Sequence, residues 1–398
     1  MADASVLAAS GQSLEDDFFN PLSPEMIADP YPAYRRLREH APVYWHQQLG
    51  AWLLTRFTDC QAVLRDSERF AADFRRVGIP TPETLLSLQT LDPPTHTPLR
   101  HLGLGALRSL DIDALTAELL ARAETDLSAL AGRGEFDFVR DFADSFTLTA
   151  MTSLLGVPGP AEDDTFHRLN ADLDRSMDSG FDPDAEAAGI QARERFNALV
   201  ESWLAHPPKQ GVIAHLVEHE AEGGVSRDVL VNSVRAFFHA GFEVPSRFLS
   251  NAVAALLDHP DAFAALREGA PMGPAIEELI RFSGPVQALS RACTEDTSIG
   301  GKTVRRGEIV VALIGAANRD PGQFPDPDAI RVDRDPNPHL GFGRGSHSCL
   351  GSVIGRAEAS AVMTAVVRHL PSLRRSGPAV PRPNATLRGL RSLPVAVN

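Results

Sequence analysis

The chain has few cysteines, no long apolar run and no basic cluster, and each scarcity excludes a class of protein. Its three cysteines, Cys60, Cys293 and Cys349, are too few and odd in number for a disulfide framework, which indicates a reducing compartment. No stretch of about 18 apolar residues is available to cross a bilayer, so we expect no membrane partner. The formal charge of −14 comes without a basic run of the kind that binds nucleic acid.

Length and composition leave the domain count open. A chain of 398 residues could form two or three domains or a single large one, and its 43% hydrophobic content is enough for a substantial core. Residues 1–22 are acidic in part and lack the apolar core of a signal peptide. We therefore expect a loose N-terminal tail and a cytoplasmic location.

A lone cysteine in a glycine-rich stretch is the feature around which the rest of the chain can be interpreted. Residues 342–351 read FGRGSHSCLG and place Cys349 among three glycines. Glycines let the backbone approach another group closely, and amide groups turned toward the sulfur would tune a thiolate metal ligand. The helical pattern of residues 350–370 begins at this cysteine, and a helix N-terminus favours the thiolate. Cysteine and glycine alone fit a buried structural cysteine in a turn at least as well.

The wider pattern FxxGxHxCxG resembles, position for position, the haem-binding loop of the cytochrome P450 family. The resemblance implies that the Cys349 thiolate is the proximal ligand of the iron of haem b. It also implies that Phe342 lies against the haem near the sulfur and that His347 binds a haem propionate. Gly343 and Gly351 belong to the same cofactor-binding loop.

Two other stretches carry candidate propionate ligands. Residues 91–108 open with an Asp-Pro-Pro triplet and place His96 and Arg100 four residues apart, on one helix face. Two donors on one face can grip an anionic group, although a polar helix face is the ordinary explanation. The stretch resembles the family's DPPxHxxLR element, in which the histidine and arginine bind a propionate. Arg291, in an extended run, resembles the family's propionate arginine.

The longest helical pattern covers residues 226–259, with a serine at the N-cap position and a proline beyond the end. About 32 helical residues would span about 48 Å, the width of a large domain. The pattern resembles the family's central helix, which crosses the distal face of the haem. Ala240, Gly241 and Glu243 match its signature, but Val244 stands where the family usually has a threonine that helps deliver protons.

The residues after Val244 do not restore that hydroxyl. Ser246 lies two positions on and points to another face of the helix. Pro245 lacks an N–H, so the Gly241 carbonyl loses its helical partner. The freed carbonyl could hold a water or a substrate donor, or the proline could serve only as a structural kink. We hypothesise that protons arrive through Glu243 with ordered water or a substrate hydroxyl.

An acid–base pair at residues 278–281 has a structural interpretation. Glu278 and Arg281 are spaced i, i+3 on a helical pattern, and such pairs are usually exposed and worth little. They resemble the family's ExxR element, and Arg334 lies at the right distance before Cys349 to complete its buried triad. The resemblance implies that this triad holds the fold behind the haem loop and takes no part in the chemistry.

Secondary structure was predicted from periodicity and turn signals along the rest of the chain. The stretch between residues 156 and 184 is acidic and without a steady period, and predicts irregular structure. The implied fold is mainly α, the cytochrome P450 fold, as a single domain over residues 23–398 with a small N-terminal β region around a buried haem. The predicted helices are 32–39, 57–65, 112–131, 138–155 and 186–205, and the predicted strands are 43–45 and 52–55.

The family resemblance implies a haem-thiolate monooxygenase that inserts one oxygen atom from O2 into a small molecule. The chain has no room for a fused reductase, so electrons from NAD(P)H are expected through a separate ferredoxin reductase and ferredoxin. Arg344 and Arg356 could form a local basic patch for an acidic ferredoxin, or they could be solvated surface. Val244 keeps open a peroxide-using or non-hydroxylating oxidase, such as a phenol-coupling enzyme. A haem protein that binds a ligand without turnover is the third alternative.

The substrate is harder to predict than the family. Soluble bacterial members with tailoring roles in natural-product pathways are the closest likeness, so a polyketide or aromatic substrate, free or carrier-bound, is the expectation. Arg75 and Arg76 could meet a substrate carboxylate, although two solvated arginines explain them more simply. A mainly apolar pocket is expected from Leu85, Leu86, Phe238, Phe242, Ala288 and Leu289.

Overall fold

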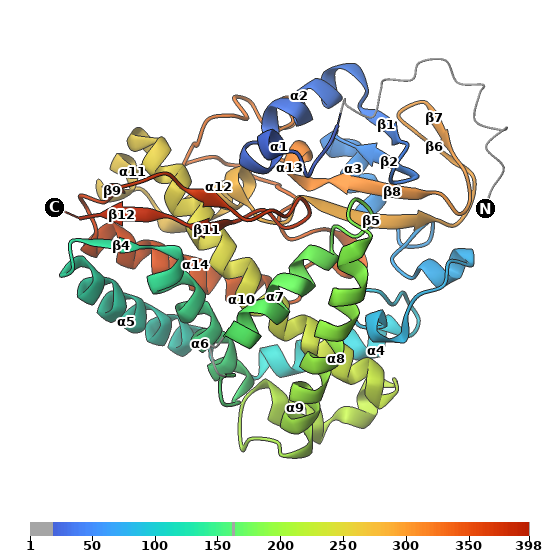
Figure 1. The fold of residues 1–398 in the computed structure, drawn as a ribbon, viewed down its shortest axis with the longest axis horizontal. Helices are drawn as coiled ribbons and strands as arrows, with labels where there is room; N and C mark the ends of the chain where they lie inside the picture. The colour runs from blue at the N-terminus through green and yellow to red at the C-terminus, as the bar shows by residue number, and fades with distance from the viewer. Residues whose placement is uncertain (1–18, 161–163, 398) are drawn as a thin grey trace.

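The structure, a computed structural model, describes residues 19–160 and 164–397 (Figure 1). Helices make up most of these residues, and a smaller β-rich part lies beside the N-terminal helices, as the predicted mainly α class requires. The predicted tail falls largely on residues 1–18, outside the described residues. Phe19, which the same prediction included, is buried and stacks on Tyr34.

The main sheet has five strands in the order β1-β2-β8-β5-β3. Strands β1 and β2 form an antiparallel hairpin, β2 pairs with β8 in parallel, and β5 returns antiparallel to β8. Strand β8 reads IVVAL and is mostly buried, as expected for a strand covered on both faces. The strands are β1 (Val43–His46), β2 (Ala51–Leu54), β3 (Phe70–Ala71), β5 (Ala288–Cys293) and β8 (Ile309–Leu313).

Short helices and strands complete the framework around this sheet. Helices α2 and α3 match two predicted helices closely, and the small sheets pair the C-terminal strands with each other and with β4. The helices are α1 (Pro24–Ala28), α2 (Tyr31–His40), α3 (Phe57–Arg65) and α13 (Ile314–Ala317). The strands are β4 (Glu135–Asp137), β6 (Thr297–Ile299), β7 (Lys302–Val304), β9 (Arg374–Arg375), β10 (Val380–Pro381), β11 (Leu390–Ser392) and β12 (Pro394–Ala396).

Helix α10 (Arg227–Asp258) runs through the middle of the helical body (Figure 1). Its N-cap is Ser226, whose side chain accepts a hydrogen bond from the Val229 amide, and it continues through Pro245. Its neighbours bury its apolar residues on several sides. The other long helices are α4 (His96–Arg108), α5 (Ile112–Ala131), α6 (Asp144–Leu155), α8 (Asp184–Ala205), α12 (Met272–Ser283) and α14 (Ser352–His369), and the shorter ones include α9 (Val212–Glu218) and α11 (Pro260–Arg267).

The prediction of irregular structure between residues 156 and 184 was wrong. This segment contains α7 (Asp164–Ser176), which packs on α8 and α10. Phe166, Leu169 and Leu173 recur at i, i+3 and i+7, which is a helical apolar stripe within an acidic sequence. The predicted start of the 138–155 helix is also different, because residues Val139–Ala143 form a π-helical turn before α6 begins.

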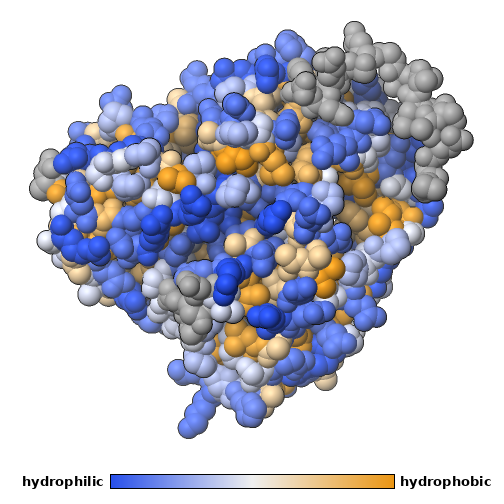
Figure 2. All heavy atoms as spheres, viewed as in Figure 1, coloured by the Kyte–Doolittle hydropathy of each residue, from blue (hydrophilic) through white to orange (hydrophobic). Residues whose placement is uncertain are grey.

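The surface seen in Figure 2 is mostly hydrophilic, with separate apolar patches between polar side chains. Within residues 19–160 and 164–397, no helix is both long and apolar enough to span a bilayer.

Candidate active site

The cysteine loop folds tightly between β5, α3 and α14. The Cys349 amide donates to the Phe342 carbonyl at 2.8 Å, and Gly345 has a φ of 74°. A Cβ on Gly345 would come within 2.5 Å of the Leu64 carbonyl oxygen, so only glycine fits there. Cys349 itself is exposed, whereas Cys60 and Cys293 are buried. The loop therefore presents this one sulfur.

The surroundings of the Cys349 sulfur work in two directions on its ionisation. The residue keeps an exposed surface, but the protein atoms around its sulfur desolvate the thiol and raise its pKa. A hydrogen bond from the Gly351 backbone and the charges of Arg100 and Arg356 lower that pKa. Helix α14 begins at Ser352, two residues later than the predicted start at residue 350. The backbone donor and the two cations are therefore the local groups that favour a thiolate.

Four basic side chains gather beside Cys349. Arg100 donates to the Ser348 carbonyl at 2.8 Å, and the rings of His96 and His347 lie 4.6 Å apart. Arg291 is buried and donates to the carbonyl of its own neighbour, Ser290. Among the described residues, no carboxylate lies within ion-pair distance of His96, Arg100 or Arg291. This cluster therefore has more positive donors than the protein's own acids neutralise.

Two of these groups show how the cluster is balanced. The Nε2 atom of His96 is buried without a hydrogen-bond partner, and burial, helped by His347 and Arg100, lowers its pKa to about 4. His347 Nε2 instead lies 3.1 Å from Asp92. Burial opposes ionisation of Asp92, but bonds from His347, the Asp73 backbone and other donors lower its pKa to about 2. His347 is thus held by an acid, whereas His96 is not.

The residues present suit haem b. An exposed sulfur in a glycine loop offers a ligand to iron, and His96, Arg100 and Arg291 offer donors to a ligand with two carboxylates. Phe342 belongs to the same loop. The guanidinium carbon of Arg356, on α14, lies 4.3 Å from the centroid of the Phe342 ring. The orphaned His96 nitrogen is the observation that this cofactor would explain.

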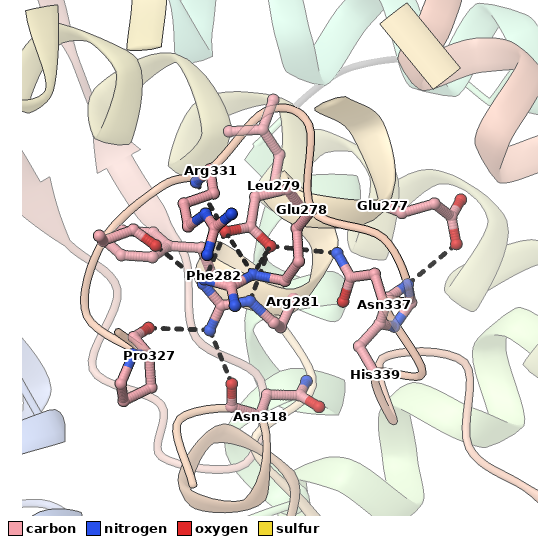
Figure 3. Close-up of polar contacts among 12 residues, drawn as sticks. Glu277, Glu278, Leu279, Arg281, Phe282, Asn318, Pro327, Arg331, Asn337 and His339 are labelled. Atoms are coloured by element: carbon pink, nitrogen blue, oxygen red, sulfur yellow. Dashed lines mark hydrogen bonds and ion pairs between the residues drawn. The ribbon is translucent and has the colours of Figure 1, made fainter. Parts of the chain in front are cut away.

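Behind the loop, Glu278, Arg281 and Arg334 form a closed ionic cluster, here called the ExxR triad. Figure 3 shows Glu278 and Arg281 of this triad. Glu278 has a fully buried side chain and accepts two 2.8 Å bonds from Arg281. Arg334 Nε lies 3.0 Å from it, and the Arg331 amide and Asn337 add further bonds. The Glu278 carboxylate thus neutralises both guanidiniums, so the triad is suited to holding the loop framework.

Partly exposed residues form one stripe along the middle of α10, which is otherwise largely buried. They recur at i, i+3, i+4, i+7, i+8 and i+11, the spacing of a single helix face. A cavity of about 40 Å³ is lined by Ser233 and Phe237 of this stripe and by Leu350, which follows Cys349. Two residues of the stripe thus lie near the residue that follows Cys349. The stripe consists of Ser233, Ala236, Phe237, Ala240, Gly241 and Val244.

Glu243 lies off this stripe, buried between α10 and α7. Its carboxylate lies 3.3 Å from Arg247, which also donates to Asp174 of α7 and to the Leu387 carbonyl. His239 Nε2 lies 3.5 Å from Asp174. Burial and the nearby Asp174 raise the pKa of Glu243, whereas Arg247 lowers it.

The structure places Val244 and Ser246 on different sides of α10. Val244 lies on the open stripe next to Ala240 and Gly241. The Ser246 hydroxyl donates to Asp144 of α6, so it is directed away from the stripe. No hydroxyl from this part of α10 replaces the one that Val244 lacks.

The six predicted pocket residues fall into three pairs. Leu85 and Leu86 lie in the 83–86 segment, whose carbonyls at 83 and 86 accept bonds from Asn232 of α10. Phe238 and Phe242 lie off the open stripe. Both are buried, and they pack on Phe166, Phe196 and Trp203 of α7 and α8.

These two rings therefore hold α10 to α7 and α8. The sequence prediction missed Ser233 and Phe237, which lie within the same ten residues of α10 as the two phenylalanines. Their i, i+4 spacing on a face with Ala240 and Val244 was the signal that could have found them. The third pair is on β5, where Leu289 packs near the Cβ position of Gly343 and Ala288 is half-buried beside it. We call α7, α8 and the 83–86 segment the roof.

Of the four surface arginines that the sequence singled out, three form ion pairs. Arg75 binds Asp73 at 2.7 Å and Arg76 binds Asp92 at 3.1 Å, so neither is a free cation waiting for a substrate carboxylate. Arg356 binds Glu277 at 2.6 Å. Arg344 donates to three backbone carbonyls and lies near Arg356 and Arg65.

Comparison with known proteins agrees with this geometry. The sequence profile described as Cytochrome P450 matches residues 273–387. The beta-dihydromenaquinone-9 omega-hydroxylase of Mycobacterium tuberculosis is 32% identical over 397 residues, which cover 95% of this chain and 78% of that protein.

Two solved structures have the same fold. The crystal structure of CalO2 matches with a TM-score of 0.85 and 32% identity over 96% of this chain and 98% of that one. P450BioI in complex with a hexadec-9Z-enoic acid ligated acyl carrier protein matches with a TM-score of 0.80 and 28% identity, over 94% and 100%. The described chain therefore belongs to the cytochrome P450 family of haem monooxygenases, which use O2 and electrons delivered from NAD(P)H by redox partners.

Proposed function

We propose that this chain oxygenates a C–H or C=C bond of an elongated, largely apolar natural product. The observation that carries the proposal is the open stripe of α10, whose Ser233 and Phe237 line an apolar cavity together with Leu350, the residue after Cys349. The stripe is apolar apart from Ser233. An apolar surface of this kind selects a substrate by shape and excludes water from the reacting carbon.

Different residues of the chain would bind the iron and the propionates of the cofactor. Cys349 would ligate the iron through its thiolate, and His96, Arg100, Arg291 and His347 would hold the propionates. When bound, the haem supplies the activation of O2. The backbone of Gly351 and the charge of Arg100 stabilise the negative sulfur.

We assign proton delivery to Glu243. Its raised pKa lets the carboxyl carry a proton nearer to neutral pH than an ordinary glutamate does. Arg247, Asp174 and His239 connect it to the roof, while Val244 offers no hydroxyl. A water or a substrate hydroxyl then has to bridge the carboxyl to the reacting side of α10. Val244 thus moves the proton route from a side-chain alcohol to this acid.

We infer that a separate, acidic ferredoxin, reduced by a ferredoxin reductase, delivers the electrons in the cytoplasm. Arg344 belongs to the cysteine loop. Arg65 and Arg356 lie close enough to it for their charges to lower its pKa. Arg356 is partly neutralised by Glu277, so Arg65 and Arg344 are the main positive charges offered to the ferredoxin. Lowering the salt concentration should therefore speed electron transfer.

Titration of the haem-loaded ferric protein tests the proposal. The Soret band would be followed while aromatic acids, macrolides, terpenes, long-chain lipids and carrier-linked acyl groups are added separately. A saturable shift toward high spin, followed by one oxygenated product with NAD(P)H and redox partners, supports the proposal. A shift with no oxygenated product under the same conditions contradicts it.

The source of the substrate is part of the same test. A shift caused only by a carrier-linked acyl group assigns protein-delivered substrates to this chain, as in the solved complex of its relative with an acyl carrier protein. A shift caused by free ligands assigns diffusible ones.

A further inference from the structure

Two arginines in the roof region are buried without an acid to neutralise them. Arg193 of α8 and Arg235 of α10 are 6% and 7% exposed. No carboxylate of the described residues lies within ion-pair distance of either guanidinium. Arginine is almost never buried to this extent unless it is paired. The two side chains therefore require a specific explanation.

Their hydrogen bonds go only to neutral groups. Arg235 donates to Asn197 at 2.9 Å and to the Thr84 carbonyl at 2.8 Å. Arg193 donates to the Ser176 hydroxyl at 3.3 Å, and its Nε is buried with no hydrogen-bond partner. The Thr84 hydroxyl beside them is also buried and unpartnered. A buried donor without a partner destabilises the folded protein, so this arrangement is unfavourable in the protein alone.

The two positive charges also oppose each other. Burial and, second to it, the charge of Arg193 together lower the pKa of Arg235 to about 10. The nearest acid to affect Arg193 is Glu186, which is exposed two helical turns away on α8. A negatively charged group placed between the two guanidiniums would satisfy both and would remove this repulsion.

The position of the pair relates it to the reacting end of the site. Arg235 directly precedes Ala236 of the open stripe in the sequence and comes nine residues before Val244. At the helical rise, nine residues correspond to about 14 Å. A ligand that reaches both places has to be elongated, with its acidic end and its reacting carbon separated by roughly that length.

We propose that Arg193 and Arg235 form an anion-binding subsite for the acidic end of an elongated, otherwise apolar substrate. The subsite rests on the proposed oxygenase function, because it sets which part of the substrate reaches the cysteine side. The anionic group is either a free carboxylate or the phosphate of a carrier's prosthetic arm. Both have oxygens that accept bidentate bonds from arginine.

The haem-loaded protein tests this with matched ligands. Soret titration and thermal shift would be measured with tetradecanoic acid, its methyl ester and tetradecanoyl acyl carrier protein. We expect the wild type to bind the acid at least about tenfold more tightly than the ester. Arg193→Gln and Arg235→Gln should bring this ratio close to one, and Arg235→Lys should retain part of it. Arg75→Gln, which breaks only an exposed pair with Asp73, is the control and should keep the wild-type ratio.

Each outcome is decisive. The subsite is overturned if both glutamine variants bind the acid and the carrier-linked chain as tightly as the wild type does, or if the wild type binds none of the three ligands. Weaker binding of the carrier-linked chain alone in the variants supports the subsite and identifies the phosphate as its anion. Loss of haem or a lower melting temperature in one variant would leave the other as the test.

Failure of the proposed function is visible separately. If the wild type distinguishes acid from ester but oxygenates neither with its redox partners, the subsite stands and the oxygenase proposal for such substrates fails.

Discussion

The ExxR triad and the roof both bury arginines, but they satisfy them in opposite ways. Behind the cysteine loop, Glu278 neutralises Arg281 and Arg334 through several bonds of 2.8–3.1 Å. Where the roof meets α10, Arg193 and Arg235 have only neutral partners. The comparison indicates that buried charges paired with protein acids stabilise the fold, whereas buried charges without such a partner are available to a ligand.

Removing the acid of the triad should produce the largest effect on stability. Glu278→Gln leaves two buried guanidiniums without their counter-charge, so we expect the free energy of unfolding to fall by about 3–5 kcal/mol. Denaturant unfolding measures it. Glu124→Gln, which removes an exposed partner of Arg368, is the control and should leave the midpoint unchanged. A loss below about 1 kcal/mol for Glu278→Gln would mean that the triad does not hold the fold.

The next effect concerns the acid at the edge of the roof. Glu243→Gln should lower product formation by about 100-fold, because the glutamine cannot carry the proton, while Val244→Thr should change it by less than about threefold. Product formed per NAD(P)H consumed is the measurement, with haem content and the Soret shift checked in each variant. A large gain in Val244→Thr would show that Glu243 had not replaced the missing alcohol.

Acid titration should distinguish the two regions by the sign of their pH dependence. Burial raises the pKa of Glu277 near the triad, but bonds from His339 and Arg356 lower it from 4.5 to about 2. The folded protein then holds fewer protons than the unfolded chain in this range, so stability is lost as the pH falls from 4.5 to about 2. The pKa of Glu243 is raised, so its contribution to stability has the opposite sign and increases as the pH falls.

Glu277→Gln should therefore show a shallower loss of stability than the wild type across that range. Urea midpoints measured at successive pH values would test this. Equal slopes in wild type and variant would show that the bonds from His339 and Arg356 do not stabilise the ionised carboxylate.

Sequence reasoning worked best where the signal was local. The i, i+3 spacing of Glu278 and Arg281, the serine cap of α10 and the spacing around Cys349 each lie within a few residues, and the structure places them in the expected elements. Their geometry follows from helix periodicity and glycine turns, which sequence displays directly.

The roof could not be predicted in the same way. Its arginine pair depends on α8, α10 and the 83–86 segment meeting in space, and three elements far apart in sequence give no local pattern. Helix α7 was missed because acidic residues obscure its apolar stripe. The sequence left open a role for Arg75 and Arg76 as carboxylate ligands, because it did not show that Asp73 and Asp92 are their partners.

The central claim, that the roof arginines serve a ligand and not the fold, is tested most directly by the stability of Arg235→Met. Methionine has a similar length and no charge, so it removes an unpaired guanidinium from a buried position. The account predicts that the free energy of unfolding of the ligand-free, haem-loaded protein changes by less than about 1 kcal/mol. A loss of about 3–5 kcal/mol, as large as that expected for Glu278→Gln, would contradict it.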